Sequence, residues 1–348
     1  DHKGILAKYG LNGSFPDKVT EEASKCPAKV TAQDIQNRRD MRNVFTLTID
    51  PLDARDFDDA LSIQELQNGD WEIGVHIADV SHYVKQGTQL DREANRRGNS
   101  TYLVGEVVPM LPHRLSSGIC SLVEGEERLV KSVLFVFSAQ GKLLQSKLAE
   151  SVILSDKRLT YEQAGLFLKE KNLAKIRSAK PPSSRYSGNP GKSLEELNDQ
   201  ILEKLQLSIR KIWEFASLIR GDRMKKGALD LESMEVKILV DQKGQPEKIL
   251  QSESDESHHM IEEFMLLANE TVARELRKQK LPGIFRVHPD PDPENLEELR
   301  SFLQVFGISC GELTGRKEVT KMLNALNKHP LAQVLRIKFL RSLKQACY

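Results

Sequence analysis

Apolar and polar positions alternate along much of the chain between residues 44 and 155. Runs such as VFTLTID, ALSIQEL and WEIGVHIADV have the period of two that is typical of strands with one buried face. Asn68-Gly69, between the second and third runs, predicts a hairpin turn. RLVKSVLFVFS and KLLQSKLAESVIL continue the pattern after a short polar helix expected over 91–97. This part of the chain is therefore expected to form mainly sheet.

Helical periodicity takes over after residue 155. Thr160 with Gln163 has the pattern of a capping box, which predicts a helix start, and Ser193 with Glu196 predicts the start of a much longer helix. The remaining pattern predicts a hairpin over 234–250, a helix over 258–279, a strand over 283–288 and two or three helices over 293–347. This uneven alternation predicts a mixed α/β fold, with a central, mainly antiparallel or mixed sheet surrounded by helices.

Two segments lack a strong periodic pattern. Residues 1–43 are polar and weakly helical, and we expect them to be an N-terminal lead-in to a domain over 44–348. AKPPSSRYSGNPGK, at 179–192, is rich in Pro, Gly and Ser and predicts an exposed loop.

Composition narrows the classes of partner. The formal net charge is only +1, from 51 basic and 50 acidic residues, so recognition of nucleic acid or membrane by overall charge is excluded. The chain lacks an apolar run of about 18 residues. Its cysteines are too few and too far apart for a disulfide framework or a cysteine-rich zinc site, which favours reduced thiols in the cytoplasm: Cys26, Cys120, Cys310 and Cys347.

The stretch TIDPLDARDFDDALSI, at 48–63, concentrates negative charge between apolar residues. It contains Asp50, Asp53, Asp56, Asp58 and Asp59. Two carboxylates about 4 Å apart repel by roughly 1 kcal/mol in water and roughly 4 kcal/mol near a protein surface. A fold that gathers these groups therefore needs a counter-charge.

A solvated turn would explain the aspartates but not the apolar residues around them. A calcium-binding EF-hand loop does not fit, because the spacing is wrong and Leu61 stands where that loop needs a glutamate. Oxygen ligands alone favour Mg²⁺ or Mn²⁺, and a pair of such ions is suited to hydrolysis of a phosphodiester. The absence of a P-loop and of a dinucleotide fingerprint argues against nucleoside triphosphate and nicotinamide cofactors.

IDPLDARDFDDALS resembles the main acidic motif of the ribonuclease II / ribonuclease R family, the RNB exoribonucleases, whose pattern is roughly I-D-P-x-x-A-x-D-x-D-D-A. The blocks GVHIADVSHYV, STYLVGEVVPMLPHRLSSGICSL, GALDLES, IEEFMLLANETVA and FRVHPDPDPE follow in the family's order. The resemblance runs from about residue 10 to the end of the chain. It implies that 44–348 is an RNB-type catalytic domain.

The resemblance also implies an activity: processive, Mg²⁺-dependent removal of nucleotides from the 3′ end of single-stranded RNA, with release of 5′-mononucleotides. Mn²⁺ is expected to substitute for Mg²⁺, and the protein is expected to be a cytoplasmic monomer. The aspartates that match the family's catalytic and metal-binding positions are Asp50, Asp56, Asp58 and Asp59. Asp53 falls at a variable position, and Asp58→Asn is the substitution expected to separate RNA binding from cleavage.

Four further residues are implied as RNA contacts. Tyr102 matches a tyrosine that stacks on bases near the 3′ end, although a half-buried strand tyrosine is the plainer alternative. Glu263 matches a glutamate implied in recognition of the ribose hydroxyl; without the family it would be a helix-start charge. Leu231 replaces a phenylalanine that several members use to close on the terminal bases. Arg97 belongs to an arginine cluster that either contacts RNA phosphates or forms a solvated face.

The chain stops at Tyr348, before a family stretch like F-T-S-P-I-R-R-Y whose arginine stabilises charge at the scissile phosphate. Loss of one such donor typically costs a factor of roughly 10² to 10³ in rate. We therefore expect a fragment, truncated at its C-terminus and impaired in catalysis. The alternatives are a non-catalytic RNA-binding or regulatory module and a two-metal phosphodiesterase that acts on small molecules.

Overall fold

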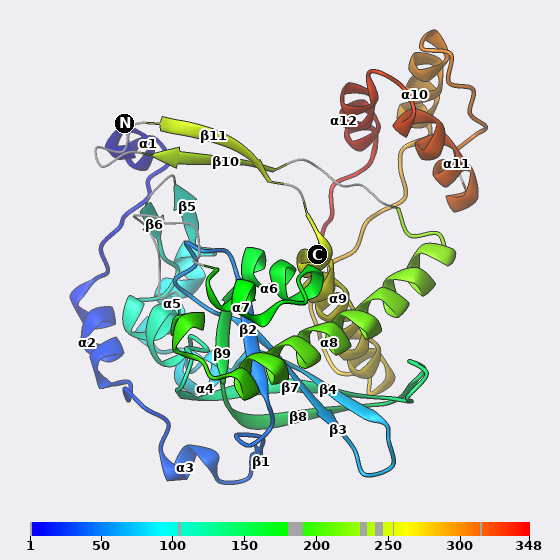
Figure 1. Ribbon diagram of the computed structural model, residues 1–348. Helices are drawn as coiled ribbons and strands as arrows, with labels where there is room; N and C mark the ends of the chain where they lie inside the picture. Colours follow the sequence, from blue (N-terminus) through cyan, green and yellow to red (C-terminus); the bar gives the residue numbers. More distant parts are fainter. Residues whose placement is uncertain are drawn as a thin grey trace. The chain divides into compact units, whose positions relative to one another are not determined.

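The computed structural model describes residues 2–103, 106–179, 191–229, 235–240, 246–252, 254–313 and 315–348 (Figure 1). Leu231 and most of the loop predicted at 179–192 lie outside these residues. The chain divides into two compact units, the first formed by Asp1–Ala216 with Met234–Thr271 and the second by Ser217–Ser233 with Val272–Tyr348. The aspartates of the stretch at 48–63 belong to the first unit.

The first unit is built on a seven-stranded sheet with the order β1-β8-β7-β4-β3-β2-β9 (Figure 1). Its strands are β1 Arg39–Asp40, β2 Thr46–Asp50, β3 Asp59–Glu65, β4 Trp71–Ala78, β7 Glu127–Phe137, β8 Leu143–Leu154 and β9 Lys157–Thr160. The neighbours from β8 to β2 are antiparallel, whereas β1 with β8 and β2 with β9 are parallel. The prediction of a mainly antiparallel, mixed sheet is confirmed.

Two separate hairpins complete the strands of this unit. The strands β5 Thr101–Leu103 and β6 Glu106–Val108 pair with each other, as do β10 Glu235–Val240 and β11 Pro246–Ser252. The predicted turn at Asn68-Gly69 joins β3 to β4, and Gly69 has a φ of +80°, which a residue with a side chain rarely adopts. This turn fixes the register that brings Asp59 opposite Ile77.

Helices surround the sheet. The helices that begin in the first unit are α1 His2–Lys8, α2 Asp17–Lys25, α3 Ala32–Ile35, α4 Val80–Tyr83, α5 Gln89–Arg97, α6 Tyr161–Lys169, α7 Leu173–Arg177, α8 Asp199–Lys225 and α9 Glu256–Lys278. Two of them, α8 and α9, cover one sheet face, because Phe137 of β7 lies 4.9 Å from Phe215 of α8 and 6.4 Å from Phe264 of α9, between ring centroids. The capping box at the start of α6 is present, as predicted.

The N-terminal segment packs on this unit. Val19 and Ala23 of α2 share a buried cluster with Leu90 of α5. Glu22 adds a polar contact, because its Oε2 accepts hydrogen bonds from the backbone N–H of Gln89 at 2.7 Å and of Leu90 at 3.3 Å. A carboxylate at a helix N-terminus is stabilised by the free amides there. Residues predicted only as a lead-in thus contribute to the core.

Two local predictions are wrong. Ser193 caps a short 3-10 helix, Leu194–Glu196, and the long helix α8 begins only at Asp199, after Asn198 accepts a hydrogen bond from the Ile201 amide at 2.9 Å. The sequence GIFRVH does not form a strand, since its only ladder contact among the described residues is a single bridge between Val287 and Cys347. A strand needs a continuous ladder with a neighbour to satisfy its backbone groups, and within the described residues this run has only that bridge.

The second unit contains the predicted C-terminal helices, α10 Pro293–Val305, α11 Arg316–Asn327 and α12 Ala332–Ser342. They bury a separate apolar cluster that includes Leu299, Leu303, Leu326, Leu335 and Phe339. Across the described part of the chain, no helix combines the length and the apolar character needed to span a membrane.

Candidate functional site

The acidic loop, residues 51–58, connects β2 to β3, so that Asp50 ends one strand and Asp59 begins the next. Its apolar members Leu52 and Phe57 are buried, at 4% and 1% exposure, and anchor the loop in the core. The Phe57 amide donates to Ser121 Oγ at 2.9 Å, and the Asp58 carbonyl accepts from the Ala78 amide at 2.9 Å. The apolar residues therefore hold the backbone in place while the aspartates remain available for chemistry.

The aspartates differ in their exposure. Asp50 is buried, at 7% exposure, Asp56 and Asp59 are partly exposed, and Asp53 and Asp58 are exposed. Among the described residues, Asp50 Oδ2 is a buried oxygen without a hydrogen-bond partner. Such an oxygen costs free energy unless a donor or a cation reaches it.

Burial and mutual repulsion perturb these carboxyls. Burial, followed by the charge of Asp59, raises the pKa of Asp50 to about 7. Burial and the neighbouring Asp58 raise the pKa of Asp59 to about 6. The pKa of Asp58 is also raised, first by partial desolvation and then by Asp56. The loop is thus short of positive charge, and a bound cation would favour the ionised forms.

Arg158 supplies part of the missing positive charge. It lies on β9, which pairs in parallel with β2, and the register places Arg158 beside Thr48 and Thr160 beside Asp50. Arg158 as a residue is 1% exposed. Its guanidinium donates from Nη2 to the Pro51 carbonyl at 2.7 Å and lowers the pKa of Asp50. In the described residues, Arg158 Nε and Nη1 have no hydrogen-bond partner. A permanent cation therefore underlies the acidic loop.

A buried ion pair fixes the start of β9. Lys157 Nζ lies 2.8 Å from Glu124 Oε2, and both side chains are at most 5% exposed. The same Glu124 oxygen accepts from the Arg158 backbone amide at 2.9 Å. Glu124 consequently holds the backbone that carries the Arg158 guanidinium.

Two aromatic residues lie near the carboxyls. Tyr102 on β5 is 64% exposed and donates from its hydroxyl to Asp56 Oδ2 at 3.2 Å. Tyr161, at the start of α6, has a raised pKa because of burial and the charges of Asp59 and Asp50. Its ring stacks on His258, with centroids 4.0 Å apart. Tyr102 thus lies on a strand with its hydroxyl bonded, as the plainer alternative has it, but it is more exposed than half-buried.

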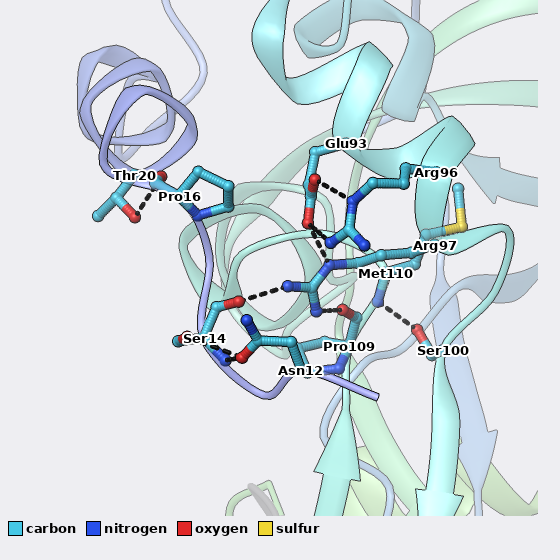
Figure 2. A network of polar contacts seen from close by, with 10 residues as sticks. All are labelled: Asn12, Ser14, Pro16, Thr20, Glu93, Arg96, Arg97, Ser100, Pro109 and Met110. Carbon is cyan, nitrogen blue, oxygen red and sulfur yellow. Dashed lines mark hydrogen bonds and ion pairs between the residues drawn. The ribbon is translucent and has the colours of Figure 1, made fainter. Parts of the chain in front are cut away.

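The structure places two other predicted RNA contacts in the interior. Glu263 on α9 is fully buried, at 0% exposure, so it does not face a surface ligand in this conformation. The Arg97 side chain is only 7% exposed and donates to Glu93, to the Pro109 carbonyl and to the Ser14 carbonyl (Figure 2). Because all three of its nitrogens are engaged, a phosphate contact by Arg97 is not supported.

The oxygen donors of the acidic loop suit one mode of metal binding better than another. In the described part of the chain, no group of three or more His, Cys, Asp or Glu side chains is arranged to hold a metal by itself. Mg²⁺, however, is commonly held by one or two carboxylates together with substrate phosphates and waters. Oxygen donors with raised pKa values, one of them an unpartnered Asp50 oxygen, fit that mode of binding. His76 is no rival ligand, because it is buried between Ser62 and Ser132.

Sequence reasoning missed Arg158 and Tyr161. Arg158 reaches the loop only through the pairing of β2 with β9, so no local spacing indicates it. The dipeptide Thr160-Tyr161 looks like an ordinary helix start, which it also is. Parallel neighbouring strands end on the same side of a sheet. Once β9 was known to pair with β2, Arg158 and Tyr161 could have been placed beside Asp50.

A mixed sheet thus carries a cluster of carboxyls with raised pKa values beside an exposed aromatic side chain. Residues 38–348 match the RNB domain family, and the chain belongs to that family. It is 40% identical to ribonuclease R of Thermotoga maritima over 353 aligned residues, which cover 100% of this chain and 46% of that protein.

Solved structures support the same assignment. Mycoplasma genitalium RNase R in complex with ribose-methylated single-stranded RNA matches with a TM-score of 0.84 and 29% identity, covering 99% of this chain and 50% of that one. The same enzyme in complex with double-stranded RNA matches with a TM-score of 0.85 and 30% identity, covering 99% and 57%. The chain thus spans about half the length of the relatives it matches.

Proposed function

We propose that this chain carries the catalytic centre of a processive, Mg²⁺-dependent 3′–5′ exoribonuclease that releases 5′-mononucleotides from single-stranded RNA. The single observation that carries the proposal is the acidic loop, in which burial and repulsion raise the pKa of Asp50 to about 7. Carboxyls with strongly raised pKa values cluster at functional sites, where burial and like charges are brought together. Membership in the RNB family and the relatives named ribonuclease R support the same reaction.

The aspartates of the acidic loop, Arg158 and Tyr102 each have a proposed task. Asp50, Asp56, Asp58 and Asp59 would hold Mg²⁺ together with the RNA phosphate, and the bound ion would supply positive charge for the attacking and leaving oxygens. The buried charge of Arg158 opposes the rise in the pKa of Asp50 and so favours its ionised form. Tyr102 offers an exposed ring beside Asp56 on which the 3′-terminal base can stack. Stacking does not depend on base identity, which suits an enzyme that must accept any RNA sequence.

The test uses a single-stranded oligoribonucleotide labelled at its 5′ end. With Mg²⁺, we expect successive shortening from the 3′ end and release of nucleoside 5′-monophosphates. Asp58→Asn should keep the affinity for RNA and lower the rate by at least roughly 10²-fold, the size expected when one electrostatic group is lost. Asp53→Asn is the matched control, since Asp53 is an exposed aspartate of the same loop outside the proposed ligand set.

Other outcomes point to the alternatives. RNA binding without shortening, in the presence of Mg²⁺ or Mn²⁺, would indicate a non-catalytic RNA-binding module. Hydrolysis of small phosphodiesters with no preference for long RNA would indicate a different phosphodiesterase. Equal rates for Asp58→Asn and Asp53→Asn would contradict the proposed role of Asp58.

A further inference from the structure

Arg97 joins its own helix to the end of the following hairpin and to a segment far away in the sequence (Figure 2). Its Nε donates to Glu93 Oε1 at 2.8 Å, its Nη1 to the Pro109 carbonyl at 2.9 Å and its Nη2 to the Ser14 carbonyl at 2.6 Å. The guanidinium carbon also lies 3.7 Å from the centroid of the Phe15 ring. A planar guanidinium with several donors can make such a junction, whereas a lysine ammonium cannot reproduce its geometry.

This junction lies at the base of the β5–β6 hairpin. Helix α5 ends at Arg97, Gly98 turns the chain with a φ of +75°, and β5 begins at Thr101. Pro109 directly follows β6, and the next amide, that of Met110, donates to Ser100 Oγ at 2.9 Å. The bonds from Arg97 and Met110 therefore close the two ends of the hairpin that carries Tyr102.

The N-terminal partner of the junction is itself held in place. Glu22 binds the amide of Gln89 at the start of α5, and Arg114 Nη2 donates to the Cys26 carbonyl at 2.9 Å. The charge of Arg97 is balanced by Glu93, whose side chain is 7% exposed. Arg97 thus connects the hairpin to an anchored segment.

We propose that Arg97 is a positioning residue for the 3′ end of the RNA: it holds the base of the β5–β6 hairpin so that the Tyr102 ring stays beside Asp56. This inference rests on the proposed function, because it requires a base to stack on Tyr102. It assigns Arg97 an indirect role and excludes the direct phosphate contact that its sequence position had suggested. The 3.2 Å bond from Tyr102 to Asp56 is the contact that the junction would preserve.

Arg96 offers a matched control. It is the neighbouring residue of the same helix and binds the same carboxylate, with Nε and Nη2 at 2.8 and 2.6 Å from the Glu93 oxygens. Its side chain is 58% exposed, and among the described residues its hydrogen bonds go to Glu93. Arg96→Ala therefore removes one positive charge without opening the base of the hairpin.

The first arm of the experiment needs no RNA. Hydrogen exchange of the amides at 101–103 and 106–108 is compared among the unsubstituted chain, Arg97→Ala and Arg96→Ala. We expect exchange at least about tenfold faster in Arg97→Ala and unchanged in Arg96→Ala. Arg97→Lys retains the charge opposite Glu93 and should give an intermediate rate; it also keeps the test usable if Arg97→Ala fails to fold.

The second arm measures stacking with an oligoribonucleotide that carries 2-aminopurine at its 3′ end. Tyr102→Ala and Arg97→Ala should each lose most of the fluorescence quenching and weaken binding roughly tenfold, which is within the range for one stacked base. In the double variant, Arg97→Ala should add little, because it acts through Tyr102. The salt dependence of binding should not change, whereas loss of a direct phosphate contact would lower its slope by about 0.7.

The outcomes distinguish a failure of the positioning role of Arg97 from a failure of the proposed function. Unchanged hairpin exchange in Arg97→Ala would overturn the positioning role whatever happens with RNA. The positioning role would also be overturned if Arg97→Ala weakened RNA binding equally in the Tyr102→Ala background and in the unsubstituted chain. A smaller salt dependence of RNA binding in Arg97→Ala would overturn it as well. Failure of the unsubstituted chain to bind RNA, with faster hairpin exchange in Arg97→Ala, would instead refute the proposed function and leave Arg97 as a fold-stabilising residue.

Discussion

Replacing Asp50 by asparagine should stabilise the metal-free protein at alkaline pH while abolishing its proposed activity. The pKa of Asp50 is raised from the ordinary 3.8 to about 7 by burial and by Asp59. Between these two values the folded state retains a proton that the unfolded state has lost, so the free energy of unfolding falls as the pH rises through this window. Above about pH 7 the folded protein must bear the full cost of a buried carboxylate.

The size of that cost follows from the two pKa values. At about 1.4 kcal/mol per pKa unit, the rise to about 7 corresponds to at most about 4 kcal/mol. An asparagine amide does not titrate, but its N–H groups need acceptors, and an unsatisfied buried group costs about 1–3 kcal/mol. We therefore expect Asp50→Asn to be more stable than the unsubstituted protein by about 1–3 kcal/mol at pH 8, with the advantage lost near pH 4.

Urea unfolding in EDTA measures this difference. Trp71 and Trp213 both lie in the first unit, so their fluorescence reports on the unit that contains the acidic loop. Asp53→Asn, at an exposed position of the same loop, should change stability much less at either pH. If the stability difference between Asp50→Asn and the unsubstituted protein were the same at pH 4 and pH 8, the reasoning from the raised pKa would be refuted.

Substitutions at three residues test separate parts of the account. Tyr102→Phe should retain most of the RNA affinity, because the ring remains, whereas Tyr102→Ala should weaken it roughly tenfold in a filter-binding titration; equal losses would contradict stacking. Arg158→Met removes the charge that lowers the pKa of Asp50, so the acid limb of the pH–rate profile should move to higher pH, and an unmoved limb would argue against that electrostatic role. Glu124→Gln leaves Lys157 as an unpaired buried charge and should lower the free energy of unfolding by about 3–5 kcal/mol; a loss below about 1 kcal/mol in urea unfolding would show that the pair is not effectively buried.

Local chemistry made the acidic loop predictable. Its aspartates lie within ten residues between two clear strand patterns, and the structure places Asp50 and Asp59 at the facing ends of β2 and β3. The mixed sheet, the Asn68-Gly69 turn and the C-terminal helices follow from equally local signals. These features depend on residues that are close in sequence, which is the range over which hydrophobic periodicity and turn propensity operate.

Long-range contacts account for most of what sequence could not show. Arg158 reaches the acidic loop through a parallel strand pair that joins residues about a hundred positions apart. Arg97 has the sequence context of a solvated helix end, yet Ser14 and Phe15, more than eighty positions away, cover it. Glu263 lies at a polar position in the pattern of α9 but is fully buried. Whether a charged residue is buried depends on tertiary packing. The spacing of residues along the sequence does not show that packing.

The central claim is that a bound divalent cation neutralises the closely spaced carboxylates of the acidic loop and takes part in RNA cleavage. Its most direct test is calorimetric titration of Mg²⁺ into the protein bound to a 2′-O-methyl oligoribonucleotide, at pH 6.5, in two buffers that differ in ionisation enthalpy. Because the pKa of Asp50 is about 7, the account predicts that Mg²⁺ uptake at pH 6.5 releases protons. This proton release should disappear at pH 8.5 and should be much smaller in Asp50→Asn, where only Asp59, with a pKa of about 6, still contributes. Mg²⁺ uptake that is identical in Asp50→Asn, or no uptake at all, would contradict it.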